Sequence, residues 1–198
     1  YFDELNISVA LPVVDQRLSY GEEVISLAEA LHEDLYFSLL EVFQKKSGRP
    51  VGDRGLQPGQ IVPEIRHSDT GYAVRVETRP FSLMDPASDE QALEQAEAPL
   101  SAAQIHHELH KIGGAPFEAV TPTGRIVHAA YVKGDDAPMM ISAGQHANET
   151  SGVVGALRAA QRLSSRQGAH FTLSPQDNPD GYALHQRLCA MQPCHMHH

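Results

Sequence analysis

The sequence predicts an α/β protein with a mixed, mostly parallel sheet flanked by helices, preceded by a small α+β region at the N-terminus. Residues 138–143 and 170–173 are short apolar runs, and an amphipathic helical pattern between them ends near residue 165. Strand, helix and strand in this order are typical of parallel pairing. Residues 22–46 contain no Gly or Pro, and their apolar residues recur at steps of three and four, which predicts a long helix.

The N-terminal half reads as alternating short strands around that helix. Residues 5–14 alternate apolar and polar side chains, which indicates a strand with one buried face. Residues 61–66 and 72–78 also alternate and flank a Ser-Asp-Thr-Gly turn, so they predict a hairpin. Residues 82–100 are acidic and rich in alanine, which favours a linker or a surface helix. We therefore predict an N-terminal accessory domain over residues 1–98 and a second domain over residues 99–198.

The second domain starts with a helix that Ser101 caps and that ends near residue 111, before a Gly-Gly pair. Residues 125–133 and 138–143 then predict two strands joined by a turn, with the second strand the more buried. The helix that starts at about residue 150 and the strand over residues 170–173 complete the order. This half of the chain carries the α/β prediction.

Composition narrows the classes of partner. The chain has 25 acidic and 15 basic residues, a formal charge of −10, and no run rich in Lys or Arg. This pattern argues against nucleic acid as a partner, since phosphate backbones are held by clustered basic residues. No apolar stretch approaches the roughly 18 residues that span a bilayer, which argues against a membrane partner. Two cysteines are too few for a disulfide scaffold, and we expect a soluble, cytoplasmic protein.

The strongest chemical signal is the heptapeptide GQHANET, which places His146 and Glu149 three residues apart where a strand meets a helix. Ligands of α/β sheets bind at the carboxyl ends of the strands, and Gly144 allows the backbone to bend sharply there. An imidazole nitrogen and a carboxylate oxygen are both ligands of Zn²⁺. The alternative is that Glu149 only complements the helix dipole and that His146 is satisfied by a neighbouring carbonyl.

Two linked motifs resemble the M14 zinc carboxypeptidases. Residues 138–152, PMMISAGQHANETSG, are similar to the first metal-binding segment of that family, and NPDGY at residues 178–182 follows about thirty residues later, as in the family. The resemblance covers residues 101–198 and implies an incomplete carboxypeptidase-like fold with zinc as cofactor. It also implies hydrolysis of the C-terminal residue of a peptide, or of a small amide substrate.

The resemblance further assigns roles to particular residues. It implies that His146 and Glu149 are metal ligands, and it makes Arg187 the nearest candidate for the arginine that polarises the scissile carbonyl. The family's second histidine ligand, its asparagine-arginine pair for the substrate carboxylate and its glutamate base are expected after residue 198. Two other functions stay open: a zinc-dependent deacylase that acts on N-acyl amino acids, and a non-catalytic module that binds metal or protein.

Two further groups of residues contain metal-binding side chains. His106 and His110 are one helical turn apart, but a zincin motif would need histidine where Lys111 stands, so a solvated helix face is the simpler interpretation. The tail could supply a third zinc ligand or a separate site, or it is an irregular terminal segment. Its metal-binding residues are Cys194, His195, His197 and His198.

Overall fold

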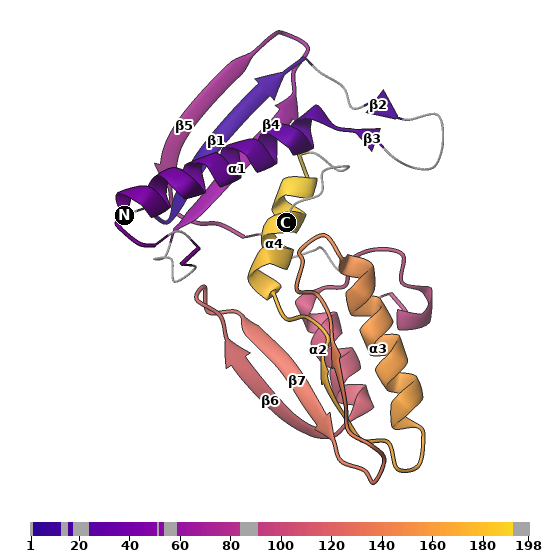
Figure 1. The fold of residues 1–198 in the computed structure, drawn as a ribbon. Coiled ribbons are helices and arrows are strands. Elements are labelled where there is room, and N and C mark those ends of the chain that lie inside the picture. Colours follow the sequence, from indigo (N-terminus) through magenta and orange to yellow (C-terminus); the bar gives the residue numbers. More distant parts are fainter. Residues whose placement is uncertain are drawn as a thin grey trace. The chain divides into compact units, whose positions relative to one another are not determined.

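The computed structural model describes residues 2–12, 16–17, 24–50, 52–53, 59–83 and 91–191. The chain forms two compact units, one covering Tyr1–Ser82 with Leu188–His197 and the other covering Leu83–Arg187 (Figure 1). Each unit contains its own sheet and its own cluster of buried apolar side chains. None of the described helices is long and apolar enough to cross a membrane.

The first unit is built on a sheet in which β1 is the central strand. Its elements are β1 (Glu4–Leu11), β2 (Gln16–Arg17), β3 (Val24–Ile25), α1 (Leu27–Lys46), β4 (Gln60–His67) and β5 (Ala73–Arg79). β1 pairs in parallel with β4 and antiparallel with β5, whereas β2 and β3 pair only with each other among the described residues. The hairpin predicted from residues 61–66 and 72–78 is therefore wrong. The alternating pattern located both strands, but it could not show that β1 inserts between them.

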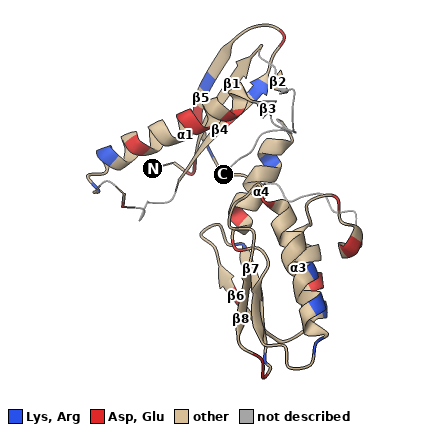
Figure 2. Ribbon diagram, turned by 45° about the vertical axis from the view of Figure 1, so that its right-hand side comes forward, with Lys and Arg blue, Asp and Glu red and all other residues tan. Residues whose placement is uncertain are grey.

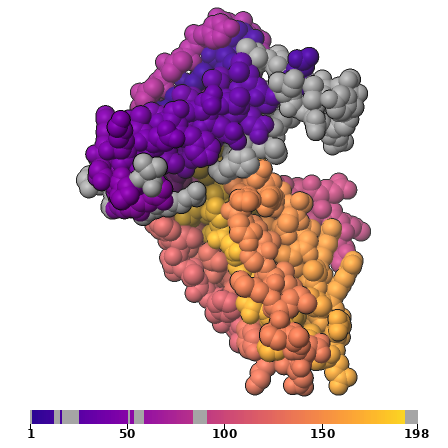
Figure 3. Space-filling model, in the orientation of Figure 1, coloured from indigo at the N-terminus to yellow at the C-terminus, as the bar shows by residue number. Residues whose placement is uncertain are grey.

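Helix α1 covers one face of this sheet, and its surface is visible in Figure 3. The helix begins at Leu27, later than the pattern predicted, because the Ser26 side chain accepts a hydrogen bond from the Glu29 amide at 3.1 Å and caps it. Ala28 packs with Leu11 of β1 and Ile65 of β4 in the core of this unit. Burial of these side chains holds helix and sheet together.

The charges of α1 follow the helix dipole. Glu29 lies in its first turn, and Lys45 and Lys46 lie in its last turn. Figure 2 shows the basic residues at the C-terminal end of this helix and acidic residues along it. Acidic side chains near a helix N-terminus and basic ones near its C-terminus each stabilise the helix by a few tenths of a kcal/mol, up to about 1 kcal/mol.

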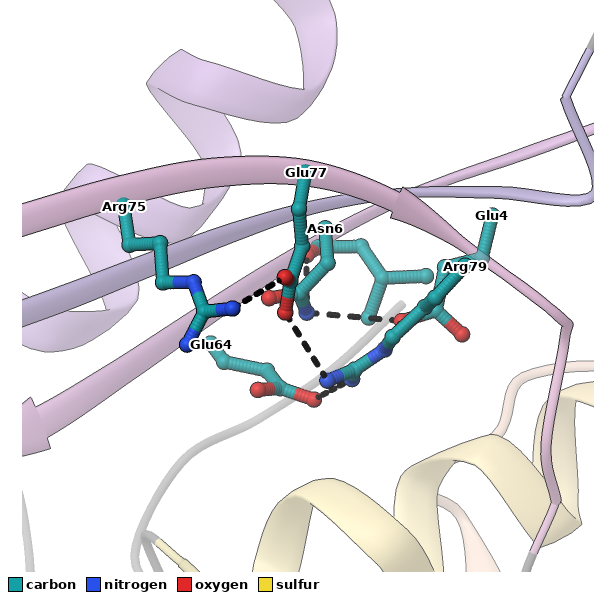
Figure 4. Close-up of polar contacts among 7 residues, drawn as sticks. Glu4, Asn6, Glu64, Arg75, Glu77 and Arg79 are labelled. Carbon is teal, nitrogen blue, oxygen red and sulfur yellow. Dashed lines mark hydrogen bonds and ion pairs between the residues drawn. The ribbon is translucent and has the colours of Figure 1, made fainter.

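The other face of the first sheet is polar and is ordered by paired charges. Arg79 donates from Nε to Glu4 Oε1 at 2.8 Å and from a terminal nitrogen to Glu64, and Glu4 is 0% exposed. Figure 4 shows Arg79 among these carboxylates, with Asn6 donating to Glu4 beside it. Burial by itself lowers the pKa of Arg79, but the hydrogen bonds and charges of Glu4 and Glu64 outweigh it and raise that pKa. The guanidinium therefore pairs with two enclosed carboxylates at once.

The second unit combines a mixed sheet with helices. Its elements are η1 (Leu93–Gln95), α2 (Ala102–Ile112), β6 (Ala115–Val120), β7 (Ile126–Val132), β8 (Met139–Ser142), α3 (Thr150–Ser164), β9 (Phe171–Ser174) and α4 (Pro179–Cys189), which belongs to this unit as far as Arg187. Ser101 caps α2 through a hydrogen bond from the Gln104 amide, as predicted. Leu109 of α2, Leu157 of α3 and Leu173 of β9 belong to one buried cluster, so both helices share a core with the sheet. The general α/β prediction is confirmed.

The order of the strands differs from the prediction. The strand order of the sheet is β6-β7-β9-β8. Among its described pairings only that of β8 with β9 is parallel. The sheet is therefore mixed, as predicted, but the prediction that it is mostly parallel is wrong. β9 lies between β7 and β8, which therefore do not form the expected pair of neighbours. β8 is at the end of this order, and its Met139 and Met140 are 51% and 71% exposed, so the prediction that β8 is the more buried strand is also wrong.

The segment before α2 is packed rather than a linker over the part that the structure describes, residues 91–100. Leu93 and Leu100 are 5% and 1% exposed and belong to the core of the second unit. The division between the units falls after Ser82, whereas the sequence placed a boundary after residue 98, inside this packed segment. Two widely spaced leucines among alanines and glutamates were too weak a pattern to reveal the burial.

Candidate metal centre

The candidate site lies where the parallel strands β8 and β9 end side by side. The Ala143 amide donates to the Ser174 carbonyl at 3.1 Å, and the Asp177 amide donates back to the Ala143 carbonyl at 2.9 Å. Gly144 has a φ of 68°, and a Cβ at this position would lie 3.1 Å from the Cα of Gln176. Glycine is therefore needed both for the left-handed turn and for the close approach of the two loops.

His146 and Glu149 face one another at this edge. Nδ1 of His146 lies 3.1 Å from Oε1 of Glu149, and the two side chains are 66% and 56% exposed. Two ligands of one tetrahedral zinc ion, each about 2.1 Å from it, are separated by about 3.4 Å. The observed 3.1 Å is close to this value, and it is also the length of an ordinary hydrogen bond from the imidazole N–H to the carboxylate. Their exposure leaves room for further ligands.

The surroundings of Glu149 bear on the alternative interpretation of this pair. Glu149 is the N-cap residue of α3, but its side chain makes no capping hydrogen bond to the amides of that helix. Its backbone closes the turn instead, with the Glu149 amide donating to the His146 carbonyl at 3.2 Å. The carboxylate therefore contacts the imidazole and not the helix amides, and its position at the N-terminus of α3 also suits the helix dipole.

Asp177 connects the candidate site to both strands. Its carboxylate accepts hydrogen bonds from Ser142 at the end of β8, from Ser174 at the end of β9, and from Gln145 Nε2 at 2.9 Å. Gln145 immediately precedes His146, so this carboxylate fixes the loop that carries the candidate ligands. The sequence analysis missed Asp177. The signal that could have indicated it is an acidic residue directly after the second parallel strand, beside the NPDG motif.

The NPDG motif starts α4 and also contacts the metal-ligand loop. Asn178 accepts from the Gly181 amide at 2.8 Å through Oδ1, as an N-cap does, and Pro179 occupies the first helical position, where a missing amide hydrogen costs little. The other end of the Asn178 amide group donates to the Gln145 carbonyl at 3.2 Å. One side chain therefore caps the helix and holds the loop.

Asp180 and Tyr182 anchor the start of α4. Asp180 accepts from Thr121 at 2.9 Å and from Thr123 at 2.5 Å, in the turn between β6 and β7. Tyr182 is buried and donates its hydroxyl to the Leu100 carbonyl at 2.9 Å. Burial raises the pKa of Tyr182, although the hydrogen bond to that carbonyl acts in the opposite direction. These contacts show that the NPDG motif helps to fix the start of α4 against the rest of the second unit.

Arg187 lies near the C-terminal end of α4. It is in the last turn of α4, and at about 1.5 Å per residue its Cα is roughly 12 Å along the helix axis from Pro179, where α4 leaves the site. The role of Arg187 as the carbonyl-polarising group stays a prediction, without support from this placement.

A third metal ligand does not emerge from the described part of the chain. Among those residues, no three His, Cys, Asp or Glu side chains form a group that could hold a metal ion as they stand. Cys194, His195, His197 and His198, which the sequence analysis considered as a source of the third ligand, lie outside the described residues. The assignment of His146 and Glu149 as zinc ligands therefore stays a prediction.

Comparisons with protein-family models, with curated proteins and with solved structures found no match to this chain.

Proposed function

We propose that this chain carries the metal-ligand segment of a zinc-dependent metallocarboxypeptidase, which hydrolyses the C-terminal residue of a peptide. The observation that carries the proposal is the separation of 3.1 Å between His146 Nδ1 and Glu149 Oε1 at the carboxyl edge of β8 and β9. Binding at this edge of a sheet is usual for α/β proteins. The resemblance of the two motifs to the M14 family supplies the reaction class.

In this proposal the neutral imidazole of His146 and the carboxylate of Glu149 hold the metal. When bound, zinc supplies a Lewis acid for the substrate carbonyl and lowers the pKa of bound water to about 7. The contacts of Asp177 and Asn178 with residue 145 hold the two ligands at their separation. Such supporting contacts to ligands typically change metal affinity by about 10- to 100-fold.

The first experiment measures metal content without relying on activity. We expect His146→Ala and Glu149→Gln each to lower the number of zinc ions bound per chain by one, measured by atomic absorption after dialysis. His107→Gln is the control, since it removes an exposed imidazole that lies on α2, a different element. Wild-type zinc content in His146→Ala would overturn the assignment.

The second experiment identifies the reaction. The full-length protein, loaded with zinc, is incubated with N-blocked dipeptides that have a free C-terminal carboxylate and with N-acyl amino acids. Release of the C-terminal residue from the dipeptides supports the carboxypeptidase, whereas hydrolysis of only the N-acyl amino acids supports the deacylase. Zinc binding at His146 with turnover of neither set would contradict an enzyme and favour a non-catalytic metal-binding module.

A further inference from the structure

A second group of histidines lies in the second unit, on elements that do not contribute to the candidate zinc site. His106 and His110 are one turn apart on α2, so they project from the same side of the helix. His128 is on β7, and its ring lies against the ring of His106, with centroids 4.3 Å apart and planes inclined by 33°. The fold therefore adds a third imidazole to the pair that was visible in the sequence.

The three histidines border one cleft. It has a volume of about 260 Å³, and its wall includes His106, His110, His128 and Glu118 together with the glycines that follow α2. His106 and His110 are exposed, and His128 is half-buried. Their side chains can thus be reached from solvent, and the two on α2 can change rotamer without displacing a core.

Glu118 fixes the hydrogen position on His128. Nδ1 of His128 lies 2.8 Å from Oε1 of Glu118, its cross-strand partner on β6. A carboxylate only accepts hydrogen bonds, so Nδ1 must carry the hydrogen, and in the neutral ring Nε2 then bears the free lone pair. Histidines that bind metals usually donate their other nitrogen to a carboxylate or carbonyl in this way.

The present positions of the rings are close to those that a metal would need, but they are not identical. As they stand, no three such side chains in the described residues meet around one point. Two imidazoles on one tetrahedral metal have ring centroids about 5 Å apart, given a metal–nitrogen distance of about 2.1 Å. The rings of His106 and His128 are 4.3 Å apart, so metal binding requires these two rings to separate by about 1 Å and to reorient, and it requires a rotamer change of His110.

We propose that His106, His110 and His128 form a second site, independent of His146 and Glu149, that binds a borderline divalent cation of the Zn²⁺, Co²⁺ or Ni²⁺ class. Imidazole nitrogens favour these metals, whereas Mg²⁺ and Ca²⁺ require oxygen ligands. Glu118 is the positioning residue, because it acts through His128. The proposed site does not depend on an H-E-x-x-H motif in α2, because the third histidine of the site, His128, comes from β7.

The test uses the chain with Glu149→Gln and His146→Ala already introduced, so that zinc binding at the first site is removed. Zn²⁺ is titrated by calorimetry, and Co²⁺ is titrated by visible absorption. We expect this double variant to bind Zn²⁺, and we expect His106→Gln and His110→Gln each to weaken that binding by at least about 100-fold. Glu118→Gln should weaken it by about 10- to 100-fold, as the loss of a supporting carboxylate does.

His107→Gln is the matched control, because His107 is on the same helix and equally exposed but borders a different cleft. His107→Gln should leave the affinity for Zn²⁺ unchanged. Any other zinc site on the chain is present in both variants, so a difference between His106→Gln and His107→Gln reports on the proposed site. Equal affinities in these two variants would overturn the proposal. So would a double variant that binds no Zn²⁺ while far-ultraviolet circular dichroism shows that it is folded.

Discussion

The carboxylate of Asp177 offers the sharpest test of how the candidate site is built. We consider Asp177→Asn, which preserves the shape of the side chain and removes its charge. The carboxylate accepts hydrogen bonds from Ser142, Ser174 and Gln145. Asparagine has a single acceptor oxygen and places an NH₂ group where the second oxygen was, so at least one of these donors loses its partner.

The magnitude follows from the exposure of the three donors. Hydrogen bonds to charged groups contribute about 1.5–3 kcal/mol each when they are buried. Ser174 is 8% exposed and keeps most of that value, whereas Ser142 and Gln145 are exposed and can turn to water. We therefore expect Asp177→Asn to lower the free energy of unfolding by about 2 kcal/mol.

The assay is urea denaturation of the metal-free chain, followed by circular dichroism, so that the result does not depend on zinc. Asp135→Asn is the matched control: it removes the same charge from an exposed position in the turn between β7 and β8 and should change stability by less than about 0.5 kcal/mol. Equal stabilities of the two variants would refute the reasoning. In the metal-bound protein, Asp177→Asn should also weaken zinc binding by about 10- to 100-fold.

Three further predictions test other parts of the fold. Gly155→Ala should stabilise α3 by about 0.5–1 kcal/mol, because a Cβ at this position meets nothing within 4 Å. Gly181→Ala should instead destabilise α4, because its Cβ would collide with the side chain of Asn178, which caps the helix. The melting temperatures of the two variants, measured by thermal denaturation, are compared with that of the wild type. Arg79→Met should cost about 3 kcal/mol in urea denaturation, since it removes the guanidinium that pairs with the enclosed Glu4, and an unchanged midpoint would contradict this. Burial lowers the pKa of His185 below its ordinary value of 6.5, so as the pH falls the histidine is protonated in the unfolded chain before it is protonated in the folded chain. The free energy of unfolding should therefore fall as the pH falls below about 6.5, and His185→Gln should make this pH dependence weaker.

Local patterns located most of the helices and strands, but they missed β6 and β3 and did not show how the strands pair. The cap at Ser101 and the helix after Glu149 depend on residues within one or two turns, and the sequence placed both correctly. The neighbours of β1 are 56 or more residues away along the chain, and those of β9 are 32 to 43 residues away. Alternation shows only that a strand has two faces, so it left open which strand inserts between which others.

The spacing of His146 and Glu149 by itself determined that the two side chains can meet, because a turn between a strand and a helix brings residues three apart together. The sequence likewise determined the start of α4, since Asn and Pro at 178 and 179 are suited to the cap and the first helical position. Only the tertiary structure decided that Asp177 ties both strand ends to the ligand loop, that Arg187 lies at the far end of its helix, and that His128 faces His106. The physical reason is that these relations depend on which elements pack together, and packing joins residues that no local pattern connects.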